Sequence, residues 1–191
     1  MPAALETRRL RLRRLEASDE ADLIALDLDP EVMRYVGSPA GVKTPAETAE
    51  RARERIRAGR SGEQEPLGFW VIEGREDRAF LGLGALLFMP TRESGVADVP
   101  DVADVEVAYR LARSAWGRGF ATEAAGALVA HALRTVGLPR VVAVTYPENQ
   151  ASQRVLDKLG FEPRGFLDYK GVRATYHVLT QAVWAAAPGL H

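Results

Sequence analysis

The feature of the sequence that most constrains the fold is a glycine loop between a strand and a long helix. Residues 105–111 are predicted to form the strand. Residues 120–136 are predicted to form the helix, because their small and aliphatic side chains recur on one face at spacings of three and four. Gly137 ends this helix. Gly117 and Gly119 lie between the two elements and let the backbone turn tightly from one into the other.

This loop has the chemistry of an anion site. Successive N–H groups of a glycine turn converge on one point. The first four N–H groups of a helix have no partner within it, and the macrodipole adds partial positive charge there, so phosphate is a typical ligand. Arg118 can add a charged contact and the Thr122 hydroxyl a further donor. The two glycines alone are equally consistent with a tight turn that binds nothing.

Two other nucleotide-binding patterns compete with this interpretation. The P-loop pattern, a glycine followed after four residues by Gly-Lys-Ser/Thr, is absent from the sequence. The dinucleotide fingerprint requires a small residue where Thr122 stands and an acid at the end of the next strand, near which Glu148 is found. Because helices precede the strands and no repeated βαβ unit surrounds the loop, dinucleotide binding is the weaker alternative.

The N-terminal part of the chain predicts one strand and then helices. Residues 8–15 alternate apolar and basic side chains, which indicates a strand with one buried face. Ser18 is the expected N-cap of the helix that follows. A second, short helix is expected to begin at Asp29-Pro30 and to end at Gly37.

A third helix and a hairpin follow. Residues 44–47 form a capping box with proline at the first helical position, which predicts a helix to about Arg57 that stops at Gly59. Residues 68–73 and 80–89 are rich in aromatic and aliphatic side chains and are separated by a polar turn. They therefore predict a β-hairpin.

The rest of the chain alternates strands and helices. Residues 91–101 are expected to be a polar loop, residues 140–146 a strand and residues 149–159 a helix. Two further strands are expected near 164–169 and 175–184. Without a linker, repeat or low-complexity tract, the sequence predicts one mixed α/β domain over residues 1–191.

Composition limits the function classes. Hydrophobic residues make up 47% of the 191 residues and charged residues 27%, as in globular domains. The net charge of -1 gives no general attraction to nucleic acid or to an anionic membrane. The absence of cysteine excludes disulfides, thiolate metal sites and a cysteine nucleophile, and the three histidines are too dispersed to predict a metal site. With no signal-like start and no apolar run of about 20 residues, we expect a cytoplasmic protein.

Three segments resemble, in order and spacing, the signature of the GNAT acetyltransferases. They are Glu106-Val107-Ala108-Tyr109-Arg110-Leu111, Trp116-Gly117-Arg118-Gly119-Phe120-Ala121-Thr122-Glu123-Ala124 and Asn149-Gln150-Ala151-Ser152-Gln153-Arg154-Val155-Leu156-Asp157-Lys158-Leu159-Gly160-Phe161. The opening Leu10-Arg11-Leu12-Arg13 and the closing Leu179-Thr180-Gln181 also resemble the branch that acetylates the N-termini of ribosomal proteins. The resemblance covers nearly the whole chain and is much less specific for the substrate than for the family.

The resemblance implies a fold, a cofactor and the residues that bind it. The fold is α/β (of the α+β type), with a mixed, twisted sheet of six or seven strands and helices on both faces. The cofactor is acetyl-CoA, with its pantetheine arm between two strands that begin parallel and splay apart. Ser114 departs from the Gln or Arg of the family motif, which affects a side-chain contact only. The implied cofactor-binding residues are Tyr109, Leu111, Gly117, Arg118, Gly119, Phe120, Ala121, Thr122, Asn149, Ser152 and Arg154.

The catalytic residues are also implied by the resemblance. Leu156 stands where many relatives have a tyrosine that protonates the leaving thiolate. The branch resembled uses a serine three residues after the asparagine, which here is Ser152. Glu106 is the expected base, on the strand where relatives carry a carboxylate. Local explanations remain open for each residue: Asn149 as a helix cap, Ser152 as a first-turn serine and Glu106 as a surface or ion-paired carboxylate.

The sequence therefore predicts an enzyme that moves an acetyl group from acetyl-CoA directly to a primary amine, either a protein N-terminus or a small molecule. A non-catalytic protein that binds or senses acyl-CoA is the alternative. Neither nucleic acid nor a membrane is an expected partner, and a homodimer is compatible with the family.

Overall fold

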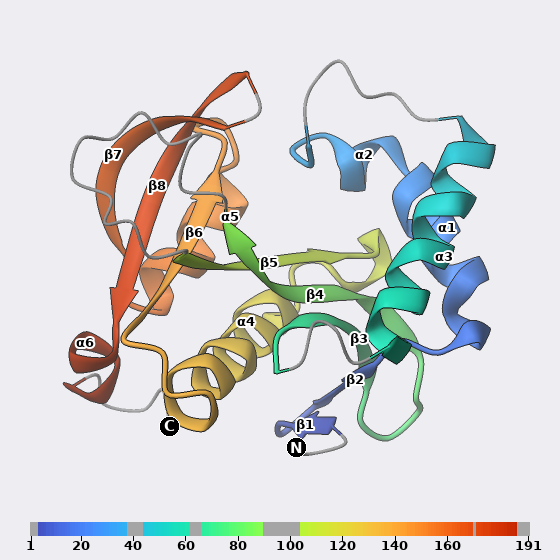
Figure 1. Cartoon of the computed structure of the whole chain (residues 1–191), viewed down its shortest axis with the longest axis horizontal. Coiled ribbons are helices and arrows are strands. Elements are labelled where there is room, and N and C mark those ends of the chain that lie inside the picture. Colours follow the sequence, from blue (N-terminus) through green and yellow to red (C-terminus); the bar gives the residue numbers. More distant parts are fainter. Residues whose placement is uncertain (1–3, 38–43, 62–65, 90–103, 170, 187–191) are drawn as a thin grey trace.

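The computed structural model describes residues 4–37, 44–61, 66–89, 104–169 and 171–186. Its strands form one mixed sheet in the order β1-β2-β3-β4-β5-β6-β8-β7 (Figure 1). The strands are β1 (Ala4–Glu6), β2 (Leu10–Arg14), β3 (Gly68–Gly74), β4 (Phe80–Met89), β5 (Asp104–Leu111), β6 (Arg140–Thr145), β7 (Glu162–Tyr169) and β8 (Val172–Thr180).

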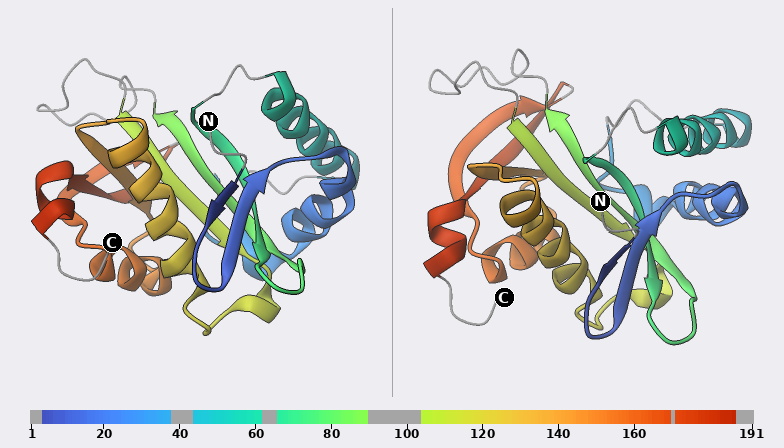
Figure 2. Two further views of the ribbon diagram at one scale, coloured as in Figure 1. Left: turned by 90° about the horizontal axis from the view of Figure 1, so that it is seen from below. Right: turned by 60° about the horizontal axis from the view of Figure 1, so that its bottom comes forward.

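Helices cover both faces of the sheet, as expected. The helices are α1 (Glu20–Leu28), α2 (Pro30–Met33), α3 (Pro45–Ser61), α4 (Phe120–Ala130), α5 (Gln150–Lys158) and α6 (Gln181–Ala186). Figure 2 shows α4 on one side of the sheet and the pair α1 and α3 on the other. Leu10, Ile72 and Leu128 belong to the core beneath α4, whereas Leu23 and Val71 belong to the core beneath α1 and α3.

Strands β5 and β6 are the parallel pair of the sheet, and they separate soon after they meet. Their pairing consists of a single register position, Glu106 opposite Val142. At the start of β5, the carboxylate of Asp104 accepts hydrogen bonds from Arg140 Nε at 2.6 Å and from the Tyr176 hydroxyl at 2.7 Å. These bonds join β5 to β6 and β8 at one end, and Figure 1 shows β6 diverging from β5 beyond it. The described sheet thus contains an opening between its two halves.

The sheet has eight described strands, where the sequence predicted six or seven. The predicted strand over residues 8–15 is in fact the second arm of a hairpin, because β1 (Ala4–Glu6) pairs with β2 in antiparallel register. Near the C-terminus the prediction of a strand through Trp184 is wrong beyond Thr180. There the Thr180 hydroxyl accepts the Val183 N–H at 3.3 Å and caps α6.

Two predicted helix boundaries also differ. Ser18 does not cap α1; instead the carboxylate of Asp19 accepts the Glu16 N–H at 2.7 Å in the 3₁₀ turn that precedes this helix. Helix α3 continues through Gly59 to Ser61, because one glycine lowers helix stability without ending the hydrogen-bonded backbone. The α-helical part of the long helix ends at Ala130 and a π-helical turn follows it.

Several local predictions are confirmed. The Thr44 N–H donates to Glu47 Oε2 at 2.7 Å and the Glu47 N–H to Thr44 Oγ1 at 3.2 Å, which is the predicted capping box. Helix α2 begins at Pro30 as predicted, with Asp29 as its cap through the Glu31 N–H, but it ends at Met33 rather than at the predicted Gly37. The hairpin of β3 and β4 forms in antiparallel register. The expected loop over 91–101 lies outside the described residues. Within those residues, no helix is both long and apolar enough to cross a membrane.

Candidate active site

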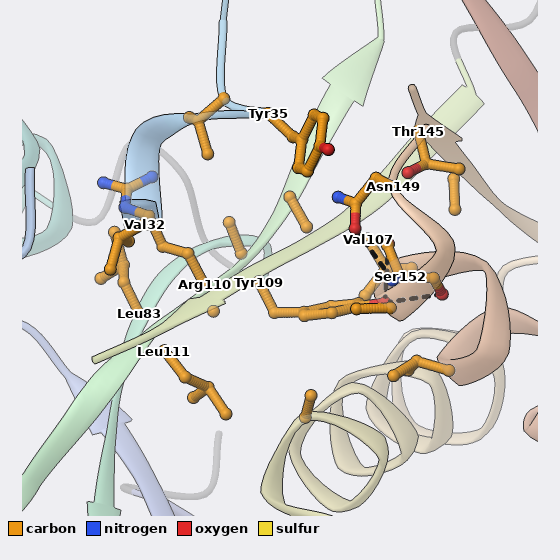
Figure 3. Close-up of a pocket in the computed structure, with 18 of the residues that line it drawn as sticks. Val32, Tyr35, Leu83, Val107, Tyr109, Arg110, Leu111, Thr145, Asn149 and Ser152 are labelled. Carbon is orange, nitrogen blue, oxygen red and sulfur yellow. Dashed lines mark hydrogen bonds between the residues drawn. The ribbon is translucent and has the colours of Figure 1, made fainter. Parts of the chain in front are cut away.

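A cavity of about 780 Å³ occupies the opening between β5 and β6. Its volume falls in the range of small-molecule and cofactor sites. Figure 3 shows side chains that enter it from β5, from α2 and from the start of α5. Of the sequence-predicted site residues, it is lined by Glu106, Tyr109, Leu111, Gly117, Gly119, Phe120, Ala121, Thr122, Asn149, Ser152 and Arg154. Arg118 is not among its lining residues.

The glycine loop has the backbone conformation that its residues predict. Gly117 and Gly119 have φ angles of 73° and 78°, in the left-handed region that L-residues with a side chain avoid. Gly119 is also the N-cap of α4. The N–H groups of the first turn of α4 therefore begin at this loop, next to the cavity. The loop and helix start therefore have the backbone geometry that an anion site requires, and they lie at the edge of the cavity.

The loop is held in place by a carboxylate in the first turn of α4. Glu123 Oε1 accepts the Thr7 hydroxyl at 2.6 Å and the Arg9 N–H at 2.8 Å, and Glu123 Oε2 accepts Arg9 Nε at 2.7 Å. Burial alone would raise the pKa of Glu123, but the hydrogen bonds from Thr7 and Arg9 outweigh it and lower the pKa. The hairpin of β1 and β2 is thereby fixed to the start of α4.

Arg9 contacts the loop in a way that the sequence did not reveal, and its guanidinium forms an ion pair with Glu123 at 2.7 Å. Its Nη1 donates to the carbonyl oxygen of Arg118 at 2.9 Å. The guanidinium of Arg9 lies 4.7 Å from the centre of the Phe120 ring, and that of Arg118 lies 4.6 Å from it. Both guanidinium groups thus lie beside the first residue of α4. Arg9 is more than a hundred residues from this loop in sequence, so no local pattern marks it.

The backbone of β5 presents polar groups to the opening. Strands β4 and β5 pair in a regular antiparallel register, and the Ala112 N–H donates to the Leu81 carbonyl oxygen at 2.9 Å. Because N–H groups alternate sides along a strand, those of Tyr109 and Leu111 point away from β4 and into the opening. The Leu111 carbonyl oxygen accepts the Trp116 indole N–H at 2.8 Å. Trp116 is thus attached to β5 by its indole N–H, and it is 47% exposed.

Two hydroxyl groups meet at the α5 side of the cavity. The Tyr109 and Ser152 hydroxyl oxygens are 3.1 Å apart (Figure 3). Asn149 Oδ1 accepts the Ser152 N–H at 3.1 Å, so Asn149 does cap α5. Burial raises the pKa of Tyr109 to about 12, which keeps its phenol protonated at neutral pH. Leu156, where relatives have a tyrosine, is buried in the core.

Glu106 also lines the cavity, but its side chain projects from the face of β5 opposite to that of Tyr109. Alternate side chains of a strand point to opposite faces, so Glu106 and Tyr109 project to different sides of the sheet. The Tyr169 hydroxyl of β7 donates to Glu106 Oε2 at 3.1 Å. Nearby lining residues include Tyr35 and Tyr146, whose rings lie 5.9 Å apart. Sequence analysis did not identify these three tyrosines, because they come from distant segments.

The described residues fit acetyl-CoA better than a metal. The loop suits a pyrophosphate, the free edge of β5 suits the amides of a pantetheine arm, and the exposed cations Arg154 and Lys158 also line the cavity. Among the described residues, no group of three or more metal-ligating side chains is found. His131 is buried, with Nε2 at 3.1 Å from the Pro66 carbonyl oxygen. His177 is also buried, and burial lowers its pKa.

Comparison with known proteins agrees with this geometry. Residues 9–162 match the acetyltransferase (GNAT) domain. The uncharacterized N-acetyltransferase YoaA of Bacillus subtilis (strain 168) is 30% identical over 164 residues, which cover 85% of each chain.

Solved structures share the fold. A GNAT-family acetyltransferase from Bacillus anthracis superposes with a TM-score of 0.74 at 19% identity, covering 94% of this chain and 99% of that one. The ribosomal L7/L12 alpha-N-protein acetyltransferase RimL, in complex with coenzyme A, gives a TM-score of 0.71 at 19% identity, covering 93% and 97%. On the strength of the domain match and the sequence relative, this chain belongs to the GNAT family of N-acetyltransferases.

Proposed function

We propose that the protein transfers an acetyl group from acetyl-CoA directly to a primary amine, with both bound in the cavity between β5 and β6. The observation that carries the proposal is that this one cavity joins an anion-binding loop, a free strand edge, a pair of hydroxyl groups and a carboxylate. Acetyl-CoA supplies an activated thioester. The residues of the chain supply binding and orientation, which account for much of the rate of a two-substrate reaction.

Binding of acetyl-CoA involves mainly backbone groups. The N–H groups from Gly117 to Thr122 receive the pyrophosphate, and Arg9 holds the loop in place through the Arg118 carbonyl oxygen. The N–H groups of Tyr109 and Leu111, on the free edge of β5, hold the pantetheine arm and the thioester carbonyl oxygen. This assignment explains how Ser114 can replace the longer polar residue of the family motif.

Departure of the thiolate is assisted by Ser152 and Tyr109. A thiol of pKa about 8.5 leaves as a thiolate with little help near neutral pH. Full proton transfer from a phenol of pKa about 12 to such a thiolate is unfavourable by roughly 3.5 units, about 5 kcal/mol. The pair therefore donates a hydrogen bond, with the Tyr109 O–H directed to Ser152 Oγ and the Ser152 O–H directed to the sulfur.

Glu106 removes the proton that the attacking amine must lose. An ammonium group has no lone pair, so the acceptor reacts as the neutral amine. For an α-amine of pKa 7.7–8.0 deprotonation near pH 7.5 costs below about 1 kcal/mol, whereas for a lysine side chain it costs about 4 kcal/mol. Glu106, directly or through water, acts as the base, and the Tyr169 hydroxyl orients its carboxylate.

Calorimetry with acetyl-CoA, followed by a panel of amines, tests the proposal. The chain has no cysteine, so a thiol reagent reports only the released CoA. Micromolar binding and thiol release with one class of amine are expected. Binding of acetyl-CoA without thiol release in the presence of any amine would favour the alternative, a protein that senses acyl-CoA. That alternative gains support from Leu156, which is buried where many relatives have the acidic tyrosine. Tight binding of NAD in place of CoA would show instead that the glycine loop binds a dinucleotide.

A further inference from the structure

Arg51, Arg55 and Arg110 surround the carboxylate of Asp27 where the Arg110 side chain of β5 meets α1 and α3. Arg55 Nη1 donates to Asp27 Oδ2 at 2.6 Å. Arg110 Nη2 lies 2.6 Å from Asp27 Oδ1. The side chains of Asp27, Arg55 and Arg110 are 3%, 9% and 13% exposed, so the cluster is largely shielded from water.

The charges of this cluster do not balance. Arg51 is one turn before Arg55 on α3, and burial and the charge of Arg55 lower its pKa. Among the described residues it makes no ion pair within 4.0 Å. Burial lowers the pKa of Arg110 to about 10, against the opposing effect of Asp27, so this guanidinium is still protonated at neutral pH. Three positive charges therefore surround the buried carboxylate of Asp27, and the other carboxylate whose charge acts on Arg51 is that of exposed Glu54 on the same helix.

Arg110 also has unused hydrogen-bonding capacity. Its Nε is buried and donates no hydrogen bond to a described residue, whereas its Nη2 is engaged by Asp27 Oδ1 at 2.6 Å. A guanidinium has five N–H donors, and leaving them unsatisfied in a buried position is costly. A cluster that served only to join α1, α3 and β5 would be more stable with a second carboxylate or with fewer cations.

The cluster faces the cavity of the active site. Arg51, Arg55 and Arg110 all line it. Figure 3 shows the Arg110 side chain extending beside Val32, at the end of the cavity away from Asn149 and Ser152. Arg110 and Glu106 project to the same face of β5, with Cα atoms about 13 Å apart. A molecule with its amine at Glu106 can therefore extend toward the arginines.

We propose that the acceptor carries, besides its amine, an anionic group (a carboxylate or phosphate) that binds to Arg51, Arg55 and Arg110. This inference rests on the proposed transferase function and specifies its substrate class. Guanidinium groups recognise both anions through paired N–H donors. The acceptor is thus an amino acid, a short peptide or an amino phosphate, and a polycation such as a polyamine is excluded from this end of the cavity.

Matched acceptors test the proposed class. Thiol release is compared for Gly-Gly-Gly and its C-terminal amide, and for phosphoethanolamine and ethanolamine. The anionic member of at least one pair is expected to have a kcat/KM at least tenfold higher, and the better pair identifies the anion as carboxylate or phosphate. Equal rates within both pairs, or faster reaction of the neutral members, would overturn the inference.

Variants locate the effect. Arg110→Gln would leave Asp27 with one partner fewer and can unfold the chain, so Arg51→Gln is the better variant. Arg51→Gln should reduce the ratio of kcat/KM for the anionic acceptor to that for the neutral acceptor about tenfold. Arg53→Gln is the matched control, because Arg53 is on the same helix but half exposed and paired with Glu20. An unchanged preference in Arg51→Gln, or an equal change in both variants, would contradict the assignment.

Binding of anions without an amine separates this inference from the transferase function. Glutarate and inorganic phosphate are titrated by calorimetry into the acetyl-CoA complex. At least one should bind, and Arg51→Gln should weaken that binding at least fivefold. Such binding with no turnover of any amine would refute the transferase and leave the anion site. Turnover of neutral amines with neither anion bound would refute the anion site and leave the transferase.

Discussion

At the scale of single residues, the hydroxyl pair of Tyr109 and Ser152 is the feature closest to the proposed chemistry. The two residues are 43 positions apart, and their hydroxyl oxygens meet because β5 passes the first turn of α5. Asn149 fixes that turn as its cap. The Ser152 hydroxyl can accept one hydrogen bond while donating another, so Tyr109 sets the direction in which Ser152 donates.

Removing either hydroxyl should slow the reaction without preventing cofactor binding. Ser152→Ala and Tyr109→Phe are each expected to lower kcat about tenfold or more, because a hydrogen bond to a charged group contributes about 1.5–3 kcal/mol. The dissociation constant for acetyl-CoA should change less than threefold (about 0.6 kcal/mol). Ser114→Ala is the control, since Ser114 is exposed beside the loop. Unchanged kcat in both variants would exclude the pair from catalysis.

Replacing the expected base should have an effect that depends on the acceptor. Glu106→Gln is expected to lower kcat/KM about 10²-fold for an α-amine, with a larger loss for a lysine side chain, because that amine is harder to deprotonate. Rates with the two amines from pH 6 to 9 provide the measurement. Glu76→Gln, at the exposed hairpin turn, should behave as the unmodified protein. If Glu106→Gln retains full activity, another group is the base.

At the scale of elements, the candidate cofactor site depends on the loop that connects strand β5 to helix α4. The loop needs left-handed backbone at two glycines, and Glu123 ties the helix that follows to the hairpin of β1 and β2. A cofactor that binds backbone N–H groups depends on this shape more than on any one side chain. The loop should therefore tolerate side-chain changes better than changes of backbone conformation.

Gly119→Ala tests that dependence. The left-handed conformation costs about 1–2 kcal/mol for a residue with a Cβ atom. A Cβ atom at this position would also meet Arg9 Nη2 at 3.4 Å. Weaker acetyl-CoA binding, by about tenfold in calorimetry, and a lower Tm are expected. Gly59→Ala is the control with the opposite expected effect. An added Cβ atom at position 59 of α3 meets no other atom within 4 Å, so this change should stabilise the protein by about 0.5–1 kcal/mol. Equal effects of the two changes would argue against loop geometry.

Sequence patterns predicted the elements that depend on local chemistry. The capping box at Thr44, the start of a short helix at Asp29-Pro30 and the helix from Phe120 follow from nearest-neighbour rules, and the structure has them. Strand β1 was missed because its three residues are too few for a pattern and depend on pairing with β2. Helix α6 was mistaken for a strand because its six residues continue an apolar run.

The site itself was only partly predictable. The glycine loop and the segment around Asn149 are contiguous motifs, so a resemblance could identify them. Arg9, the partnership of Tyr109 with Ser152 and the arginines around Asp27 depend on contacts between segments that are far apart in sequence. No spacing rule in one sequence indicates such contacts; the fold must first bring the segments together.

At the scale of the whole molecule, arginine–carboxylate networks join segments that are far apart in sequence. Glu73 of β3 accepts hydrogen bonds from Arg11 and Arg13 of β2 and from Arg78. Burial alone would raise the pKa of Glu73, but these hydrogen bonds outweigh it and lower the pKa. For Glu123, on the other side of the sheet, hydrogen bonds likewise outweigh burial and lower the pKa.

These lowered pKa values predict acid sensitivity. A carboxyl group whose pKa is lower in the folded state stabilises the protein above its unfolded pKa of about 4.3, and this stabilisation is lost as the pH falls through the folded value. The free energy of unfolding in urea should therefore decrease below about pH 4.5. Glu73→Gln should be less stable at pH 7 and should show a weaker pH dependence, whereas Glu76→Gln should not. If the free energy of unfolding depends on pH identically in Glu73→Gln and in the unmodified protein, the lowered pKa of Glu73 is not a cause of the acid sensitivity.

The brief pairing of β5 with β6 has a consequence for hydrogen exchange. Along β5 the amides of Ala108 and Arg110 are bonded to β4, whereas those of Tyr109 and Leu111 point into the opening. Exchange rates along this strand should therefore alternate between slow and fast with a period of two. Bound acetyl-CoA would slow exchange at the fast positions and remove the alternation, so a single strand would report, residue by residue, whether its missing neighbour has been replaced by a ligand.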